Sequence, residues 1–249
     1  MKFYNKVVIV GATSVIAQHC ARLLADNGSR TFILVGRNHD KLQTIKDDLQ
    51  SRSNLIENIE IKTLNFTEPA EIQNVINETC DVCLPDLVLI AHGYMPSQEV
   101  LGEDISSVKT AIEINGVSPV MFSFGYAERL KNSTESTIAT IGSVAGDRGR
   151  MTNYVYGAGK GLIEVFMQGL THRFGIQGPR ICLIKPGPTR TSMTSHISPK
   201  KLANPDEVAK DIIQGISKGK HVIYTPRKWW FIMLIVKMIP DCIFKYIKI

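Results

Sequence analysis

Short apolar runs alternate with longer amphipathic segments along most of the chain. The runs occupy residues 6–10, 31–35, 59–64, 87–91, 136–142, 180–185 and 221–224. Runs that are apolar throughout are typical of strands buried on both faces of a parallel sheet. We therefore predict a parallel sheet that is covered by helices on both sides.

Helical periodicity fills the spaces between these runs, at residues 16–24, 41–49, 69–79, 106–130, 154–173 and 205–216. Asn27-Gly28 is a typical helix end, and Asn204 followed by Pro205 is a typical helix start. Strands that alternate with helices predict a doubly wound, Rossmann-type α/β fold. We expect a single dinucleotide-binding catalytic domain at residues 1–226, followed by an apolar and basic tail at residues 227–249.

The tail contains the most apolar stretch of the chain, from Trp229 to Val236. This stretch is about half as long as the roughly 20 residues that span a bilayer. Tryptophans beside Arg227 and Lys228 are typical of a helix that lies in a membrane interface. We predict an apolar, amphipathic C-terminal helix that contacts a membrane surface or a lipid tail. Packing on a second subunit or on the chain's own core are the alternatives.

Composition narrows the class of protein. The chain has 249 residues, 44% of them hydrophobic, which is ample for one large domain. Its net charge of +6 is scattered, so we predict no nucleic-acid partner, although phosphate-bearing ligands or anionic lipids would suit it. The odd number of cysteines and the lack of a recognisable signal peptide predict a cytoplasmic location. Cys80 and Cys83 have no second pair beside them, so we predict no metal site.

Tyr156 and Lys160 are the first candidates for chemistry, because their spacing places them one turn apart on a predicted helix. A free phenol titrates near pH ~10, and a neighbouring ammonium is expected to lower that pKa. Ser143 ends a predicted strand before this helix, and its hydroxyl can bond the carbonyl oxygen that the tyrosine protonates. The trio predicts reduction of a ketone or oxidation of an alcohol.

The turn between the first strand and the first helix, residues 11–17, is a candidate site for a pyrophosphate. Of the three glycines in the dinucleotide-binding fingerprint only Gly11 is present, and Val15 and Ala17 occupy the other places. After the second strand the chain has Arg37 where a carboxylate would bind the ribose of NAD. A guanidinium suits the 2′-phosphate of NADP(H), which we therefore favour, with NAD(H) and a merely solvated arginine as the alternatives.

Together these features resemble the short-chain dehydrogenase/reductase family, and the resemblance runs from about residue 6 to residue 224. It implies that Ser143, Tyr156 and Lys160 are the catalytic residues. It also implies that Asn115, on the long fourth helix, positions a water molecule in a proton relay.

The resemblance further implies a cofactor site at the ends of several strands. The expected residues are Gly11, Thr13, Ser14, Ile16, Arg37, Asn65, Phe66, Ala91, His92, Gly93, Tyr156, Lys160, Pro186, Gly187, Thr189 and Thr191. The chain departs from the family at residues 90–93, where Ile-Ala-His-Gly replaces Asn-Asn-Ala-Gly.

One branch of the family is more closely similar, the decaprenylphosphoryl-2-keto-ribose reductases. The similarity lies in the turn at 11–17, the segments 143–148 and 153–157, and Tyr224-Thr-Pro226 followed by basic and aromatic residues. It implies an NADPH-dependent reductase that acts on a keto-sugar carried by a polyprenyl phosphate in cell-envelope glycan synthesis.

We also expect a homo-oligomer, a partner oxidase that makes the keto substrate, and peripheral contact with the inner face of the membrane. A soluble reductase of acyl-carrier or small ketone substrates is one alternative. A cofactor-binding scaffold without catalysis is the other.

Overall fold

Parallel strands form one sheet in the computed structural model, which describes residues 3–95, 104–195 and 198–247. The strands are β1 (Lys6–Val10), β2 (Thr31–Gly36), β3 (Asn58–Thr63), β4 (Leu87–Ile90), β5 (Thr137–Ile141), β6 (Arg180–Pro186) and β7 (Val222–Thr225). Their order across the sheet is β3-β2-β1-β4-β5-β6-β7. The order changes direction between β1 and β4, and ligands bind at such a switch point, outside the carboxyl ends of the strands.

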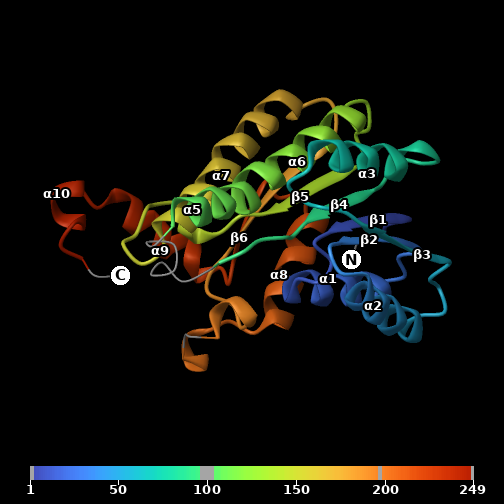
Figure 1. Ribbon diagram of the computed structural model, residues 1–249, viewed down its shortest axis with the longest axis horizontal. Coiled ribbons are helices and arrows are strands. Elements are labelled where there is room, and N and C mark those ends of the chain that lie inside the picture. Colours follow the sequence, from blue (N-terminus) through green and yellow to red (C-terminus); the bar gives the residue numbers. More distant parts are fainter. Residues whose placement is uncertain (1–2, 96–103, 196–197, 248–249) are drawn as a thin grey trace.

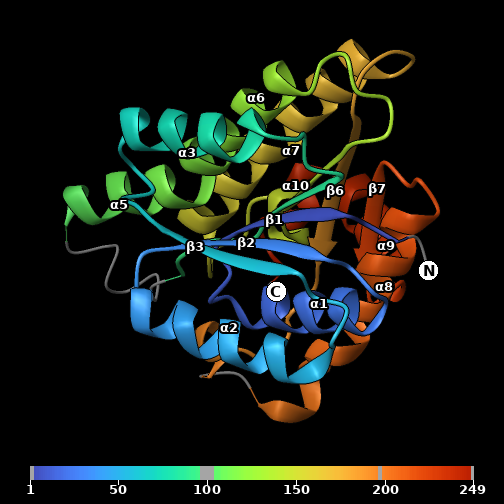
Figure 2. The ribbon, with the colours of Figure 1, turned by 90° about the vertical axis from the view of Figure 1, so that its right-hand side faces the viewer.

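Helices cover both faces of the sheet (Figures 1 and 2). One layer contains α1 (Val15–Asp26), α2 (His39–Arg52) and α8 (Pro205–Ser217), and the other contains α3 (Pro69–Asp81), α6 (Ser118–Arg129) and α7 (Tyr154–Phe174). Each layer buries its own apolar core against the sheet: Leu24, Leu42 and Ile212 belong to the first, and Phe122 and Ile163 to the second. The predicted doubly wound fold is confirmed.

The long helix predicted at residues 106–130 is interrupted. It consists of α5 (Ile105–Ile112), a π-helical turn (Glu113–Val117) and α6. Such turns insert one extra residue into the helical ladder and are frequent at functional sites. Asn115, one of the predicted catalytic residues, lies in this turn and is fully buried.

The edge strand β3 also differs from the prediction that every strand is apolar throughout. Its buried and exposed residues alternate at the start of the strand. β3 lies at the edge of the sheet, and part of one of its faces meets water there.

The tail packs on the segment that follows β5. It forms α9 (Lys228–Met238) and α10 (Asp241–Phe244), which extend to one side of the sheet in Figure 1. Met233 and Val236 are buried together with Val144. The division of the chain at residue 226 stays a prediction, but the two parts share this small core.

Arg148 joins the same segment to both tail helices. It donates hydrogen bonds to the carbonyl oxygens of Val236, at 2.7 Å, and Ile239. It also donates to the Asp241 carboxylate at 2.6 Å, and its guanidinium lies 3.9 Å from the ring centroid of Phe244. Both terminal nitrogens of the Arg148 guanidinium therefore have partners on the tail.

Much of the apolar surface of the tail remains exposed. It comprises Trp230, Phe231, Leu234, Ile235, Met238, Ile243 and Tyr246. Within the described parts of the chain, no helix has both the length and the apolar character needed to cross a bilayer.

Candidate active site

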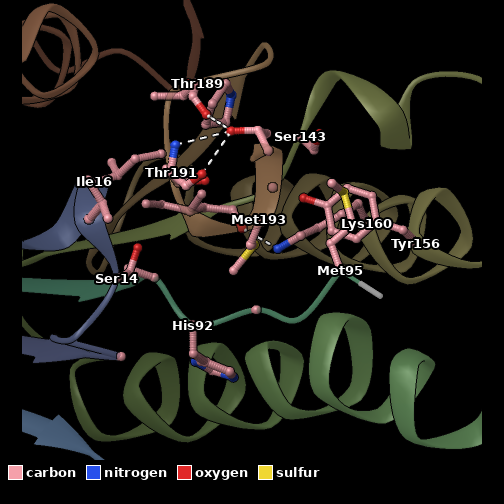
Figure 3. Close-up of a pocket in the computed structure, with 18 of the residues that line it drawn as sticks. Ser14, Ile16, His92, Met95, Ser143, Tyr156, Lys160, Thr189, Thr191 and Met193 are labelled. Carbon is pink, nitrogen blue, oxygen red and sulfur yellow. Dashed lines mark hydrogen bonds between the residues drawn. The ribbon is translucent and has the colours of Figure 1, made fainter. Parts of the chain in front are cut away.

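A cavity of about 390 Å³ opens at the carboxyl ends of the central strands, near the switch point of the sheet. Cavities of this size are typical of cofactor and small-molecule sites. Every predicted cofactor residue except Asn65 lines it, and so do Ser143, Tyr156 and Lys160. Residues predicted from distant parts of the sequence are thus brought to one place (Figure 3).

Gly11 shapes one end of the cavity. Its φ angle of 79° lies in the left-handed region, and a Cβ atom at this position would come within 2.5 Å of the backbone nitrogen of His92. A side chain is therefore excluded on both grounds. The turn leads into α1, whose first residues line the cavity, so backbone N–H groups at the start of this helix face the space where an anion would bind.

Two cations lie at the rim of the same end. Arg37 lines the cavity and is exposed, and no carboxylate among the described residues forms an ion pair with it. Lys41, which was not predicted, lines the cavity beside it. Its position follows from the capping of α2, because the Asn38 side chain accepts a hydrogen bond from the Lys41 backbone N–H at 2.9 Å.

Ser143, Tyr156 and Lys160 converge at the other end (Figure 3). Ser143 follows β5, and its hydroxyl accepts a hydrogen bond from the Ala145 backbone N–H at 3.1 Å and shares one with the Tyr156 hydroxyl. Lys160 is buried one turn after Tyr156 on α7, and its Nζ donates to the carbonyl oxygen of Ile141 at 2.9 Å. Lys160 Nζ lies 5.8 Å from the centroid of the Tyr156 ring.

The prediction that Lys160 lowers the pKa of Tyr156 is wrong for this structure. Burial raises the pKa of Tyr156, and the hydrogen bond with Ser143 offsets that shift only in part. Burial also lowers the pKa of Lys160 to about 8. Burial therefore sets the direction of both pKa shifts. Tyr156 is protonated at neutral pH and can donate a proton to a substrate oxygen.

Asn115 lies behind the cavity wall rather than in it. Its Oδ1 accepts from the Tyr94 backbone N–H at 2.8 Å, and its Nδ2 donates to the carbonyl oxygens of Ala111, at 2.9 Å, and Tyr94. A Cβ atom on Gly93 would come within 3.2 Å of Asn115 Oδ1 and 3.7 Å of Lys160 Nζ. Asn115 thus holds the segment after β4 beside Lys160, and its role in a water relay stays a prediction.

Two other predicted residues contribute in ways that the sequence did not indicate. The His92 side chain points away from the cavity, as Figure 3 shows, and bonds the Ser118 hydroxyl at 2.9 Å. Burial lowers the pKa of His92 to about 3, with help from Lys160 and Arg37, so it is neutral. The Asn65 side chain turns toward Thr67, accepting from its backbone N–H at 3.2 Å and its hydroxyl at 3.0 Å.

The loop after β6 is held by Thr194, which was not predicted. Its hydroxyl donates to the carbonyl oxygen of Thr189 at 2.6 Å and accepts from the Thr191 backbone N–H at 3.1 Å. Other lining residues that the sequence analysis missed are Val15, Met95, Ile114, Ile141, Gly142, Val144, Ala145, Arg150, Asn153, Pro188, Ser192 and Met193. Most of them flank predicted residues, and Asn153 begins the segment 153–157 that carries part of the family resemblance, but no motif marks Arg150.

Comparison with known proteins yields one family and many distant relatives. The family model described as short chain dehydrogenase matches residues 5–202. An uncharacterized oxidoreductase of Staphylococcus aureus strain N315 is 24% identical over 86% of this chain and 92% of its own length. An uncharacterized oxidoreductase of Mycobacterium tuberculosis strain H37Rv is 25% identical over 88% of each chain.

Solved structures of similar fold include a short-chain dehydrogenase from Sphingobium yanoikuyae in complex with NADPH. It has a TM-score of 0.81 and 21% identity, covering 95% of this chain and 96% of that one. A bulky-bulky ketone specific alcohol dehydrogenase from Comamonas testosteroni has a TM-score of 0.79 and 19% identity, covering 96% of both chains. These likenesses confirm the fold.

The buried Lys160 predicts a particular dependence of stability on pH. Its pKa falls from 10.5 to about 8 on folding, so between these values the unfolded chain binds more protons than the folded one. The free energy of unfolding is therefore highest above the unfolded pKa, where Lys160 is neutral in both states. It decreases as the pH falls through about 8, where the buried side chain must take up a proton. The free energy of unfolding of the wild type, minus that of Lys160→Met, should rise by about 1–3 kcal/mol across this range, measured by urea denaturation. The exposed Lys109→Met variant is the control, and a flat difference for Lys160→Met would contradict the assignment.

Proposed function

The chain belongs to the short-chain dehydrogenase family and is an NAD(P)H-dependent oxidoreductase acting on CH–OH and C=O groups. We propose that it works in the direction of reduction, as an NADPH-dependent carbonyl reductase. The observation that carries the proposal is the convergence of Ser143, Tyr156 and Lys160 in one cavity. A scaffold without catalysis would have no need of all three groups in one cavity.

Each of the three side chains has a definite task in this reduction. The Ser143 hydroxyl bonds the substrate carbonyl oxygen and polarises it. Tyr156 donates its proton to the same oxygen, and its raised pKa keeps the phenol protonated before the reaction. Lys160, held at the Ile141 carbonyl, places a cation next to the oxygen on which negative charge develops. NADPH, when bound, would supply the hydride.

The residues present fit NADPH. Gly11 leaves room for a pyrophosphate at the start of α1, and Arg37 and Lys41 place two cations at the rim of the cavity, where a 2′-phosphate would need them. Solved proteins of this fold from Sphingobium yanoikuyae and Burkholderia cenocepacia were determined with NADPH and NADP respectively. These features support NADP(H), and NAD(H) would leave both cations without a partner.

The substrate that we propose is a keto-sugar on a polyprenyl phosphate, made by a partner oxidase and used in cell-envelope glycan synthesis. The sequence resemblance to reductases of that class supports it. The tail also supports it, because α9 packs beside the segment after β5 and exposes an apolar face with Lys228 and Lys237. Such a face suits a prenyl chain or the cytoplasmic surface of an anionic membrane.

A soluble reductase of small or bulky ketones is the second candidate. It is favoured by the Comamonas testosteroni enzyme of the same fold, which is specific for bulky-bulky ketones. We also propose that the protein is a homo-oligomer. An exposed apolar surface formed by Val117, Phe124, Leu162 and Val165 on α6, α7 and the π turn supports pairing with a second copy.

Tyr156→Phe tests the proposed acid. The substitution removes only the hydroxyl, so we expect reduction of ketones to fall by about 100-fold or more while NADPH affinity changes by less than about twofold. Turnover is followed by NADPH absorbance with a panel of ketones, and binding by nucleotide fluorescence. Tyr154→Phe, at an exposed position two residues earlier, is the matched control and should leave both quantities unchanged. Retention of more than a few per cent of activity in Tyr156→Phe would rule out this residue as the acid.

Arg37→Asp tests the cofactor. A carboxylate repels a 2′-phosphate and accepts a hydrogen bond from a ribose hydroxyl, so the ratio of NADPH to NADH affinity should fall by about 100-fold. Lys41→Ala should move the ratio in the same direction by less. Titration calorimetry measures both ratios, and a wild type that binds NADH as tightly as NADPH would disprove our interpretation of Arg37.

Flotation with lipid vesicles tests the membrane contact. The wild type should float with vesicles of phosphatidylglycerol and much less with vesicles of phosphatidylcholine, because α9 combines exposed apolar residues with lysines. A variant with Phe231→Asp and Leu234→Asp should stay at the bottom of the gradient. Ile176→Asp, at a position that is 98% exposed and far along the chain from the tail, is the control. The proposal fails if the wild type does not float with anionic vesicles.

A further inference from the structure

Two arginines close together on the segment after β5 have opposite surroundings. Arg148 donates from both terminal nitrogens to the tail, as described above. Arg150 lines the cavity and is half-buried, yet the only hydrogen bond of its side chain among the described residues is from Nη2 to the Met233 sulfur at 3.2 Å. A thioether is a weak acceptor. Arg150 Nε is buried and has no hydrogen-bond partner in the described part of the chain.

Among the described residues, no carboxylate forms an ion pair with Arg150. The acid that acts on it is Asp147, whose charge raises the pKa of Arg150 against the lowering effect of burial. Asp147 is already engaged, with Lys185 Nζ at 2.5 Å and the Tyr224 hydroxyl at 2.8 Å. A guanidinium that is partly desolvated and lacks an anion is costly to the folded state unless something else binds it.

Asn153 presents a second unsatisfied group in the same wall. Its Oδ1 is buried without a hydrogen-bond partner among the described residues, and it lines the cavity. Its backbone N–H donates to the Arg150 carbonyl oxygen at 3.2 Å, so the two residues belong to one turn. This turn leads directly into α7, where Tyr156 lies within the first helical turn. A donor for an anion and an acceptor for a hydroxyl therefore lie close in the chain to the proton donor.

We propose that Arg150 binds a phosphate group carried by the ketone substrate, while Asn153 accepts a hydrogen bond from a substrate hydroxyl. This assignment rests on the proposed reductase function, since it defines the substrate class of the same cavity: phosphorylated hydroxyketones, among them sugar phosphates. Arg150 is a specificity residue and takes no part in the proton or hydride transfer. Met233 of α9 contacts Arg150, so a lipid chain attached to such a phosphate would find the apolar tail beside it.

The test compares dihydroxyacetone phosphate with dihydroxyacetone, which share a ketone and a hydroxyl and differ in the phosphate. Affinities are measured by titration calorimetry on the full chain with saturating NADP⁺, which fills the cofactor's phosphate sites and prevents turnover. We expect the wild type to prefer the phosphorylated compound by about 10- to 100-fold, as charge-assisted hydrogen bonds predict. Arg150→Met should reduce the preference below about twofold, and Arg150→Lys should retain part of it.

Arg173→Met is the matched control, because Arg173 is exposed at the far end of α7 and pairs with Glu128 at 2.7 Å. It should leave the preference unchanged. Thermal melting should show Arg150→Met to be folded, because the substitution removes no strong partner. The proposal is overturned if the wild type shows no preference for the phosphate, or if Arg150→Met keeps it.

Turnover of both ketones with NADPH separates this inference from the proposed function. Reduction of both compounds with equal kcat/KM would leave the reductase standing and disprove the role of Arg150. Phosphate-dependent binding that Arg150→Met abolishes, without reduction of either ketone by the wild type, would confirm the phosphate site and count against the reductase.

Discussion

A buried cluster of charges around Lys185 fixes the elements on which the site depends. Lys185 Nζ lies 2.5 Å from Asp147 Oδ1 and 2.6 Å from Glu164 Oε1, and the Tyr224 hydroxyl donates to Asp147 Oδ2 at 2.8 Å. Burial opposes the charge on Lys185, yet its hydrogen bonds to the two carboxylates hold its pKa above the ordinary value. A buried cation requires such partners. The four residues come from β6, the segment after β5, α7 and β7, so the cluster sets Ser143 and Tyr156 relative to the sheet.

The same segment joins the catalytic end of the cavity to the tail. Arg148 bonds α9 and α10, and a Cβ atom on Gly187 would lie 1.9 Å from the indole nitrogen of Trp229. The turn at Pro186-Gly187 therefore rests directly on the first turn of α9. Changes in the tail, whether caused by a lipid or by a second subunit, would be transmitted to the wall of the cavity that Pro186 and Gly187 line.

The family resemblance supplied many residues of the cavity wall, whereas periodicity and spacing were sufficient to predict the sheet, its covering helices and the pairing of Tyr156 with Lys160. They were sufficient because a one-turn spacing on a helix and the carboxyl ends of parallel strands leave little choice of position. They did not predict the properties of side chains that depend on burial, such as pKa shifts and missing hydrogen-bond partners. Spacing placed Lys160 beside Tyr156 but could not show that both are desolvated, which reverses the expected shift of the tyrosine pKa. Nor can a sequence distinguish Arg148, whose partners come from the tail, from Arg150, whose Nε has no partner among the described residues.

Isotope transfer tests the central claim most directly. The wild type is incubated with NADPH that carries deuterium at C4 of the nicotinamide, together with a panel of ketones that includes phosphorylated hydroxyketones. Two preparations of the cofactor are used, with the deuterium on one face of the nicotinamide ring or on the other. Mass spectrometry of the products then locates the label. We predict that one of the two preparations gives an alcohol with one deuterium on the former carbonyl carbon. Absence of deuterium from every product with both preparations, in a protein that binds NADPH, would contradict it.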